Sequence, residues 1–289
     1  MIKVLVIVGP TGTHKSDLAK MLAKKFNGAI INADAFQVYQ EIKIGTGQTP
    51  PADGINFYLN GTVSIFEEWN IKRFQQTCTQ IIKEIVKQKQ LPIIIGGSNL
   101  YIDALIYNYD LSATKRDDKY DNLTIPELFS LLSSKDEQLA NKIGNNKVRL
   151  VRALQILDQD KSLVKKNQPI YDYKIITCNY HTRKVLMDVV NNNVDKMLKN
   201  GWIDEVKNLL KAHGSEKLLR TNAFKALGYK DIVTSITSNT KLDIDKIKTN
   251  SRHYAKRQIT WIKHHYLNPL TFVQDNIDEI YNELQNWIN

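Results

Sequence analysis

The feature that most constrains the fold is an aliphatic run that leads directly into a glycine-containing loop and then a helix. Residues 2–8 are almost all aliphatic, which is typical of a parallel strand buried on both faces. The loop GPTGTHKS follows at residues 9–16, and residues 16–23 carry apolar side chains at helical spacing. A strand, a glycine loop and a helix in this order predict a phosphate-binding loop.

The loop resembles the motif G-x-x-x-x-G-K-[ST], whose backbone N–H groups converge on phosphate oxygens at a helix N-terminus. Lys15 supplies a cation, and the hydroxyl of Ser16 can hold Mg²⁺. His14 replaces the second glycine of the motif, at a position whose backbone conformation is costly for residues with a Cβ. We expect the loop to hold a diphosphate after a local adjustment at His14; the alternative is a degenerate loop that no longer binds phosphate.

The rest of the first half predicts a β-α-β arrangement. Residues 29–34 and 92–97 form short aliphatic strands, and residues 71–89 between them carry apolar side chains every three or four positions. Asp34 ends the first of these strands, and ligands sit at the carboxyl ends of strands in doubly wound sheets. Further along, we expect a helix at 146–157, a strand at 173–180 and helices at 182–210 and 245–265.

Residues 110–122 are densely charged and lack periodicity, so we expect the chain to leave the core there. The predicted organisation is a core formed by residues 1–110 and 173–289, with an inserted, mainly helical element at 111–172. The second part of the core carries the C-terminal helices. No internal repeat is present.

Composition narrows the class of protein. Hydrophobic residues make up 42% of the 289 residues and charged residues 24%, as in ordinary globular proteins. The apolar runs are far shorter than the ~20 residues that cross a bilayer, and two cysteines, Cys78 and Cys178, favour a reducing cytoplasm over a disulfide framework. The net charge of +10 favours a polyanionic partner such as nucleic acid, although a Lys- and Asn-rich composition explains this charge equally well.

The order of the later motifs resembles that of the tRNA dimethylallyltransferases. Residues 32–40 (NADAFQVYQ) and 44–47 (IGTG) resemble the S-x-D-S-x-Q-V-Y and I-G-T-A patterns of this family. Segments 92–105, 146–155 and 226–231 resemble three further family motifs, and residues 254–261 (YAKRQITW) resemble the most specific one. The chain departs from the family pattern at Ala35, Gln48, Ser98, Val189 and Asn193.

The resemblance implies a P-loop NTPase-like α/β fold with a parallel sheet core. The implied reaction transfers a dimethylallyl group from dimethylallyl diphosphate to the exocyclic N6 amine of the adenosine that is 3′-adjacent to the anticodon. The implied cofactor is Mg²⁺, held by Ser16, and the implied partner is the anticodon stem-loop of tRNA, which the inserted element grips. The resemblance also implies a cytoplasmic monomer that does not contact a membrane.

An adenine amine is a poor nucleophile, so transfer needs a base, and the resembling family uses the aspartate at the position of Asp34. The alternatives for Asp34 are that it orders Mg²⁺ or caps a turn. Ser98 matches a family threonine that donates a hydrogen bond to the bridging oxygen of the diphosphate. The residues expected to bind the diphosphate are Gly9, Thr11, Gly12, Thr13, His14, Lys15, Ser16 and Arg257.

Enzymes that modify a stacked base extract it first, so we expect a flipped adenosine to enter the site, with Gln37 reading its edge. We expect Arg257 to contact either the diphosphate or tRNA phosphates, because the planar guanidinium group of arginine can donate two hydrogen bonds to one phosphate. The residues expected to contact tRNA are Asp34, Ala35, Phe36, Gln37, Arg149, Arg152, Lys225, Lys256, Arg257 and Gln258.

Two other functions are compatible with parts of the sequence. An ATP-dependent P-loop kinase of a small molecule explains the loop and Asp34, but it leaves the block at 254–261 without a role. A noncatalytic RNA-binding remnant explains His14 and the absent arginines at Val189 and Asn193.

Overall fold

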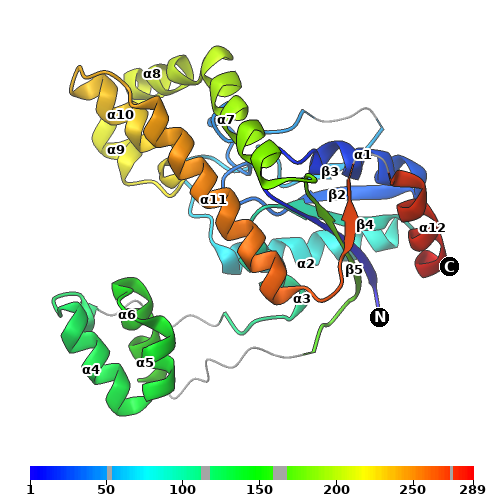
Figure 1. The fold of residues 1–289 in the computed structure, drawn as a ribbon, viewed down its shortest axis with the longest axis horizontal. Helices are drawn as coiled ribbons and strands as arrows, with labels where there is room; N and C mark the ends of the chain where they lie inside the picture. Colours follow the sequence, from blue (N-terminus) through cyan, green and yellow to red (C-terminus); the bar gives the residue numbers. More distant parts are fainter. Residues whose placement is uncertain (51–53, 112–117, 159–167, 274–275) are drawn as a thin grey trace. The chain divides into compact units, whose positions relative to one another are not determined.

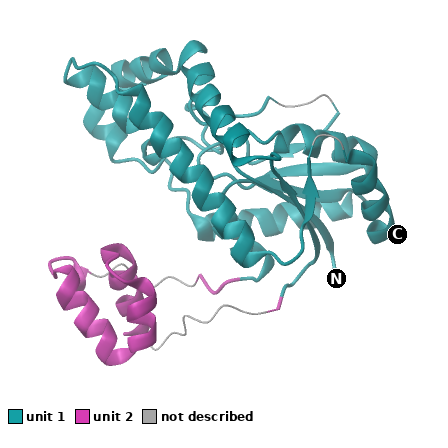
Figure 2. Ribbon diagram, viewed as in Figure 1, with its two compact units in different colours: residues 1–108, 169–289 teal, residues 109–168 magenta. Residues whose placement is uncertain are grey.

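A computed structural model describes residues 1–50, 54–111, 118–158, 168–273 and 276–289. These residues form two compact units, one of Met1–Asn108 with Pro169–Asn289 and one of Tyr109–Gln168 (Figure 2). The second unit overlaps the interval predicted for the inserted element. Part of the charged stretch predicted as a loop, residues 112–117, lies outside the described residues.

The first unit is built on a six-stranded parallel sheet in the order β3-β2-β4-β1-β5-β6 (Figure 1). The central strand β1 pairs with β4 on one side, Leu5 opposite Ile93, and with β5 on the other, Leu5 opposite Lys174. The predicted parallel α/β core is therefore confirmed. The strands are β1 (Lys3–Val8), β2 (Gly28–Asn32), β3 (Phe57–Tyr58), β4 (Leu91–Gly96), β5 (Asp172–Cys178) and β6 (Leu270–Phe272).

The continuous aliphatic character of β1 follows from burial on both faces of the sheet. Val4, Val6 and Val8 pack with the core that includes α2 (Ile71–Lys87) and α3 (Asn99–Ile106). Leu5 and Ile7 point the other way, because side chains alternate along a strand, and pack with α1 (Lys15–Lys25) and α12 (Ile277–Ile288). Helices on both faces leave the carboxyl ends of the strands as the open edge for a ligand.

The prediction of one helix over 182–210 is wrong, because two helices occupy this region. Helix α7 (Arg183–Lys199) ends before Gly201, which has φ 96°, and α8 (Trp202–His213) starts directly after it. Glycine adopts positive φ without a Cβ penalty, so the chain can turn sharply there. The remaining helices of this unit are α9 (Ser215–Leu219), the 3₁₀ helix η2 (Ala223–Lys225), α10 (Tyr229–Thr237) and α11 (Ile244–His265).

Trp202 is the packing centre that ties α8 to the loop after β2. Its side chain is fully buried, and its ring lies 5.5 Å from that of Tyr229 at an edge-to-face angle. Glu205, one turn further along α8, accepts hydrogen bonds from the backbone N–H of Ile44 at 2.8 Å and from the hydroxyl of Tyr229 at 2.6 Å. The loop beginning at Ile44 is therefore held to the helical layer.

Asp103 fixes the C-terminal end of α11 on α3. This carboxylate is 1% exposed and accepts hydrogen bonds from Trp261 Nε1 at 3.1 Å and from the Tyr266 hydroxyl at 2.9 Å. His265 Nδ1 lies 3.0 Å from Oδ2, the carboxylate oxygen that also accepts from Trp261 Nε1. A buried carboxylate is tolerated only when it is paired and hydrogen-bonded, so these donors define where α11 ends.

The second unit is a small helical cluster with its own apolar core. It contains η1 (Asp118–Tyr120), α4 (Ile125–Lys135), α5 (Glu137–Ile143) and α6 (Lys147–Leu157). Leu128 and Leu132 of α4 pack with Leu150 and Leu154 of α6, and all four are fully buried. A capping box at Thr124 starts α4.

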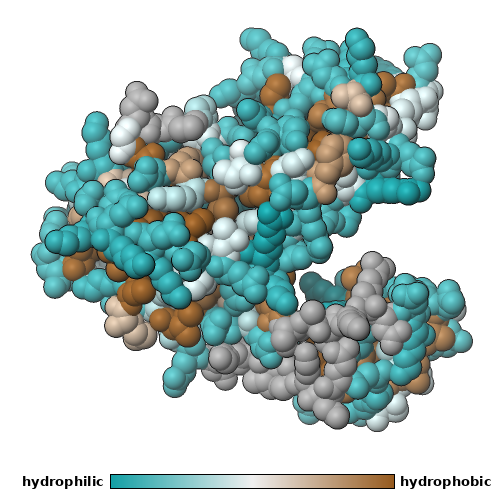
Figure 3. Space-filling model, turned by 180° about the vertical axis from the view of Figure 1, so that it is seen from behind, coloured by the Kyte–Doolittle hydropathy of each residue, from teal (hydrophilic) through white to brown (hydrophobic). Residues whose placement is uncertain are grey.

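The face of the molecule drawn in Figure 3 is largely hydrophilic, with apolar side chains scattered over it. No helix within the described ranges is long and apolar enough to span a bilayer.

We predict that Gly228→Ala destabilises the first unit more than Gly201→Ala does. Both glycines adopt the left-handed conformation, with φ 84° and 96°, so each alanine incurs about 1–2 kcal/mol of backbone strain. A Cβ on Gly228 would also lie 2.7 Å from Trp202 Cζ2, whereas a Cβ on Gly201 would meet Ile44 Cδ1 at an ordinary 3.9 Å. We expect this overpacking to lower the free energy of unfolding of Gly228→Ala by about 1–3 kcal/mol more than that of Gly201→Ala, measured by urea denaturation. Equal losses in the two variants would contradict the packing role of Trp202.

Candidate active site

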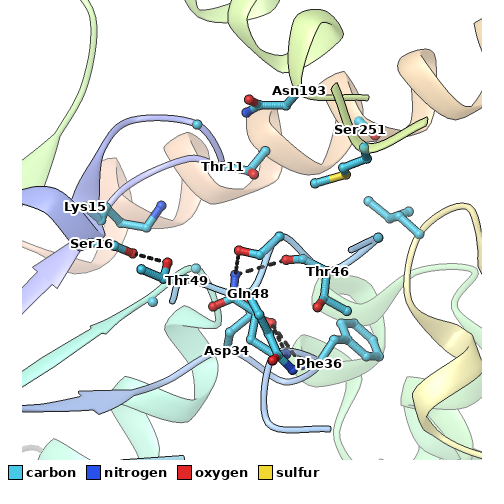
Figure 4. A pocket seen from close by; sticks show the side chains of 18 of the residues that line it. Thr11, Lys15, Ser16, Asp34, Phe36, Thr46, Gln48, Thr49, Asn193 and Ser251 are labelled. Atoms are coloured by element: carbon cyan, nitrogen blue, oxygen red, sulfur yellow. Dashed lines mark hydrogen bonds between the residues drawn. The ribbon is translucent and has the colours of Figure 1, made fainter. Parts of the chain in front are cut away.

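A cavity of about 940 Å³ opens at the carboxyl ends of β1, β2 and β4. Its walls come from the loop between β1 and α1, the loop after β2, the turn after β4, and helices α7 and α11 (Figure 4). All of these elements belong to the first unit. The cavity therefore lies at the edge where parallel α/β sheets bind ligands.

The phosphate loop is held by its own hydrogen bonds and by its neighbours. Thr13 Oγ1 donates to the carbonyl oxygen of Pro10 at 2.8 Å, and the Tyr180 hydroxyl donates to that of Gly12 at 2.9 Å. A Cβ on Gly12, which has φ 81°, would lie 2.8 Å from Val189 Cγ1 of α7. Glycine is needed here both for the conformation and for the close approach of α7.

Lys15 lies at the base of this loop, and its Nζ donates to the carbonyl oxygen of Pro10 at 2.6 Å. Burial lowers the pKa of Lys15 from its ordinary value, and the neighbouring Cys178 and Asp34 partly oppose this shift. A desolvated ammonium group interacts strongly with an anion that enters the cavity.

His14 adopts the left-handed conformation that the motif glycine would supply, with φ 56° and ψ 26°. Its Nδ1 lies 3.0 Å from Asp17 Oδ2, and both side chains are more than half exposed. The loop thus leads into α1 despite the substitution, with the strain confined to one residue.

The carboxylate of Asp34 is half-buried beside the loop. Its Oδ1 accepts hydrogen bonds from the backbone N–H groups of Phe36 at 2.9 Å and Gln37 at 3.2 Å. Burial raises the pKa of Asp34, while these two hydrogen bonds and the charge of Lys15 partly oppose the rise. The carboxylate is therefore more basic than that of a surface aspartate, as a proton acceptor needs to be.

Ser98 joins the loop after β2 to the turn after β4. Its Oγ accepts a hydrogen bond from the backbone N–H of Ala35 at 3.0 Å. A Cβ on Gly96 would overlap the carbonyl oxygen of Ala33, so the two segments approach closely. Ser98 itself lies next to the lining residue Gly97 rather than in the lining.

The loop at 44–49 contributes contacts that no motif indicated. Thr49 Oγ1 donates to Ser16 Oγ at 2.8 Å (Figure 4). The amide of Gln37 donates to the carbonyl oxygen of Thr46 at 3.0 Å and accepts from Asn32 Nδ2 at 3.1 Å. Gln37 thus holds this loop in place from inside the site.

Helix α11 brings Gln258 and Arg257 to the cavity. Gln258 is 4% exposed; its Oε1 accepts from the backbone N–H of Thr11 at 3.3 Å, and its Nε2 donates to the carbonyl oxygen of Gly97 at 3.1 Å. Arg257 is exposed, and its guanidinium lies 5.8 Å from the centre of the Tyr254 ring.

The charges in the lining favour an anionic ligand. Its carboxylates, Asp17 and Asp34, are outnumbered by the cations Lys15, Lys20, Lys43, Lys196, Lys225 and Arg257. Clefts lined by one sign of charge concentrate ligands of the other sign.

Most of the predicted site residues meet in this cavity. Thr11, Gly12, Thr13, His14, Lys15, Ser16, Asp34, Phe36, Gln37, Lys225, Arg257 and Gln258 line it. Ala35 and Ser98 are next to lining residues in sequence, Gly9 lies two residues before the lining residue Thr11, and Lys256 is exposed on α11. Arg149 and Arg152 are exposed on α6 of the second unit.

Val189 and Asn193 stood out in the sequence only as departures from a motif, and no sequence motif indicated Thr49, Lys196 or Met197. All five residues line the cavity. The spacing of Val189, Asn193 and Lys196 along one helix face was the only available signal.

Comparisons with known proteins agree on one family. The family model "IPP transferase" matches residues 37–265. A tRNA dimethylallyltransferase of Malacoplasma penetrans is 40% identical over 98% of this chain and 95% of that protein, and one of Enterococcus faecalis is 34% identical over 100% and 98%. The solved tRNA isopentenylpyrophosphate transferase of Bacillus halodurans has a TM-score of 0.73 and 31% identity, covering 100% of this chain and 96% of its own. A eukaryotic dimethylallyltransferase solved acting on tRNA has a TM-score of 0.75 and 28% identity, covering 91% and 70%.

We predict that residues at position 14 rank by their tolerance of positive φ. His14→Gly and His14→Asn keep the free energy of unfolding within about 1 kcal/mol, because both residues adopt this conformation readily. His14→Val lowers it by about 1–2 kcal/mol or more, because a β-branched side chain is least compatible with φ 56°. Thermal and urea unfolding of the three variants measure the ranking. A His14→Val variant as stable as His14→Gly would contradict the left-handed conformation.

Proposed function

The chain belongs to the IPP transferase family, and on this premise we propose that it transfers a dimethylallyl group from dimethylallyl diphosphate to the N6 amine of the adenosine 3′-adjacent to the anticodon of tRNA. The observation that carries the proposal is the half-buried carboxylate of Asp34 in the same cavity as Lys15 and Ser16 of the phosphate loop. A proton acceptor and an anion site in one cavity are what alkyl transfer from a diphosphate to an amine requires.

The phosphate loop is the proposed site of the diphosphate. As the allylic C–O bond breaks, negative charge grows on the departing diphosphate, so fixed donors stabilise the transition state more than the bound substrate. The loop amides, Lys15 and Ser16 are such donors. Arg257 on the cavity wall adds a planar guanidinium group that can donate two hydrogen bonds to a phosphate.

Asp34 is the proposed general base. The nitrogen lone pair of N6 attacks the allylic carbon, a C–N bond forms as the C–O bond breaks, and the proton of the amine passes to the carboxylate of Asp34. The two backbone N–H groups on Oδ1 orient this carboxylate, and burial makes it more basic. Ser98, joined to the Asp34 loop through Ala35, is proposed to act on the bridging oxygen.

The proposed cofactor is Mg²⁺. Among the described residues no group of three or more His, Cys, Asp or Glu side chains could form a metal cage. This fits Mg²⁺, which is usually bound through substrate phosphates and few protein ligands. Ser16 would be such a ligand, and Mg²⁺ would neutralise charge on the diphosphate.

The anticodon stem-loop is the proposed binding region of the tRNA. Phe36, Gln37, Lys225 and Arg257 line the cavity that would receive a flipped adenosine. Arg149 and Arg152 lie exposed on α6 of the second unit, residues Tyr109–Gln168, which we propose as a separate RNA-contacting element.

A small-molecule kinase is less well supported. The family model extends through the block at 254–261, which a kinase leaves without a role, and this block supplies Gln258 and Arg257 to the cavity. ATP turnover without prenyl transfer would nevertheless establish the kinase.

The direct test incubates the chain with radiolabelled dimethylallyl diphosphate and unmodified tRNA, with Asp34→Asn as the matched variant. Asparagine keeps an Oδ1 acceptor for Phe36 and Gln37 but cannot take a proton. We expect label in tRNA with the native chain and about a 10²–10⁴-fold lower rate with the variant. If the native chain binds tRNA without transferring label and His14→Gly gains transfer, the chain is a disabled remnant and the proposal fails.

We predict a bell-shaped dependence of kcat/KM on pH. The rate falls in acid as Asp34 is protonated, at a higher pH than for a surface aspartate because its pKa is raised. It falls in base as Lys15 loses its proton, at a lower pH than for an ordinary lysine because its pKa is lowered. Lys15→Arg, whose charge persists, should lose the alkaline fall and retain the acid one. An unchanged alkaline fall in that variant would exclude Lys15 as its source.

A further inference from the structure

The side chain of Gln258 connects two segments of the cavity wall that lie far apart in sequence. Its Oε1 accepts from the N–H of Thr11 in the phosphate loop, and its Nε2 donates to the carbonyl oxygen of Gly97 after β4. Gln258 is 4% exposed, and a Cβ on Gly97 would overlap its Nε2. The amide therefore fits a space that the backbone leaves for it.

The same connection continues to the proposed base. Gly97 is followed by Ser98, whose Oγ accepts from the N–H of Ala35, the residue after Asp34. A continuous path of hydrogen bonds and backbone thus runs from the phosphate loop through Gln258 to the Asp34 loop. Such a path sets the separation between the diphosphate and the proton acceptor.

We infer that Gln258 is a positioning residue that fixes the phosphate loop relative to Asp34, rather than a residue that contacts tRNA. This inference rests on the proposed function. Both ends of the Gln258 amide are bonded to backbone groups, and burial separates it from an RNA backbone. Its neighbours Lys256 and Arg257, which are exposed, are residues of this turn available to phosphate.

The test replaces Gln258 with methionine. The methionine side chain has a similar length but cannot form the hydrogen bonds to Thr11 and Gly97. We expect kcat to fall about 100-fold, the loss that a misplacement of about 1 Å produces, while the KM values for tRNA and for dimethylallyl diphosphate stay close to native. Thr260→Val, on the exposed face of the same helix, is the control and should keep the native kcat. A rise in the KM for tRNA with native kcat would make Gln258 a tRNA contact and overturn the inference.

Amide hydrogen exchange gives a readout that does not depend on activity. In Gln258→Met, we expect faster exchange in the phosphate loop, with native exchange in the distant helix α12. Inorganic diphosphate should still bind. An inactive native chain would defeat the proposed function, whereas unchanged exchange at Thr11 would defeat the positioning role.

If Gln258→Met does not fold, Gln258→Glu serves as the second variant. Glutamate keeps an acceptor for the N–H of Thr11, but its second oxygen faces the carbonyl oxygen of Gly97 and repels it. We expect the same loss of kcat, and a native kcat in this variant would overturn the inference.

Discussion

The architecture of the site depends on two opposite charges that are half-buried at the same edge of the sheet. Lys15 and Asp34 each lose hydration, which lowers the pKa of the lysine and raises that of the aspartate, and each partly compensates the other. An ion removed from water is costly unless it is paired and hydrogen-bonded. Parallel strands make this arrangement possible, because β1 and β2 flank β4, end at the same edge of the sheet and lead both residues to one cavity.

The surrounding elements hold these two charged segments rigidly rather than adding chemistry. Helix α7 packs closely against Gly12, and the Tyr180 hydroxyl donates a hydrogen bond to the carbonyl oxygen of Gly12. The Gln37 side chain holds the loop after β2 through a hydrogen bond to the carbonyl oxygen of Thr46. Asp103 sets the position of α11 through three aromatic or imidazole donors. Preorganised dipoles act on developing charge without the cost of reorientation, so a fixed arrangement at this edge would favour the proposed transfer.

Local sequence patterns were sufficient for the core and for much of the site. The aliphatic run of β1, the glycine loop and the start of α1 are contiguous, so their pattern predicts both the fold and the position of Lys15. The break between α7 and α8 depends on a single residue, Gly201, inside an otherwise helical pattern. The contacts of Thr49 with Ser16 and of Gln258 with Thr11 join residues 33 and 247 positions apart, and no local pattern encodes such pairs. Strands β3 and β6 have 2 and 3 residues, which is too short for a recognisable alternation of apolar and polar side chains.

The departures at Val189 and Asn193 change how the cavity supplies positive charge. The face of α7 over Gly12 is uncharged at these positions, so the cations of the lining come from other positions: Lys15, Lys20, Lys43, Lys196, Lys225 and Arg257. Lysine ammonium groups are compact and strongly hydrated, whereas the planar guanidinium of Arg257 can bind a phosphate through two hydrogen bonds. Exposed charges are also screened by salt, with a Debye length of about 8 Å at physiological ionic strength. The exposed cations Lys43, Lys196 and Arg257 therefore attract an anion over a distance, while the proposed specific contacts depend on the phosphate loop, on Lys15 and on the alignment that α11 maintains.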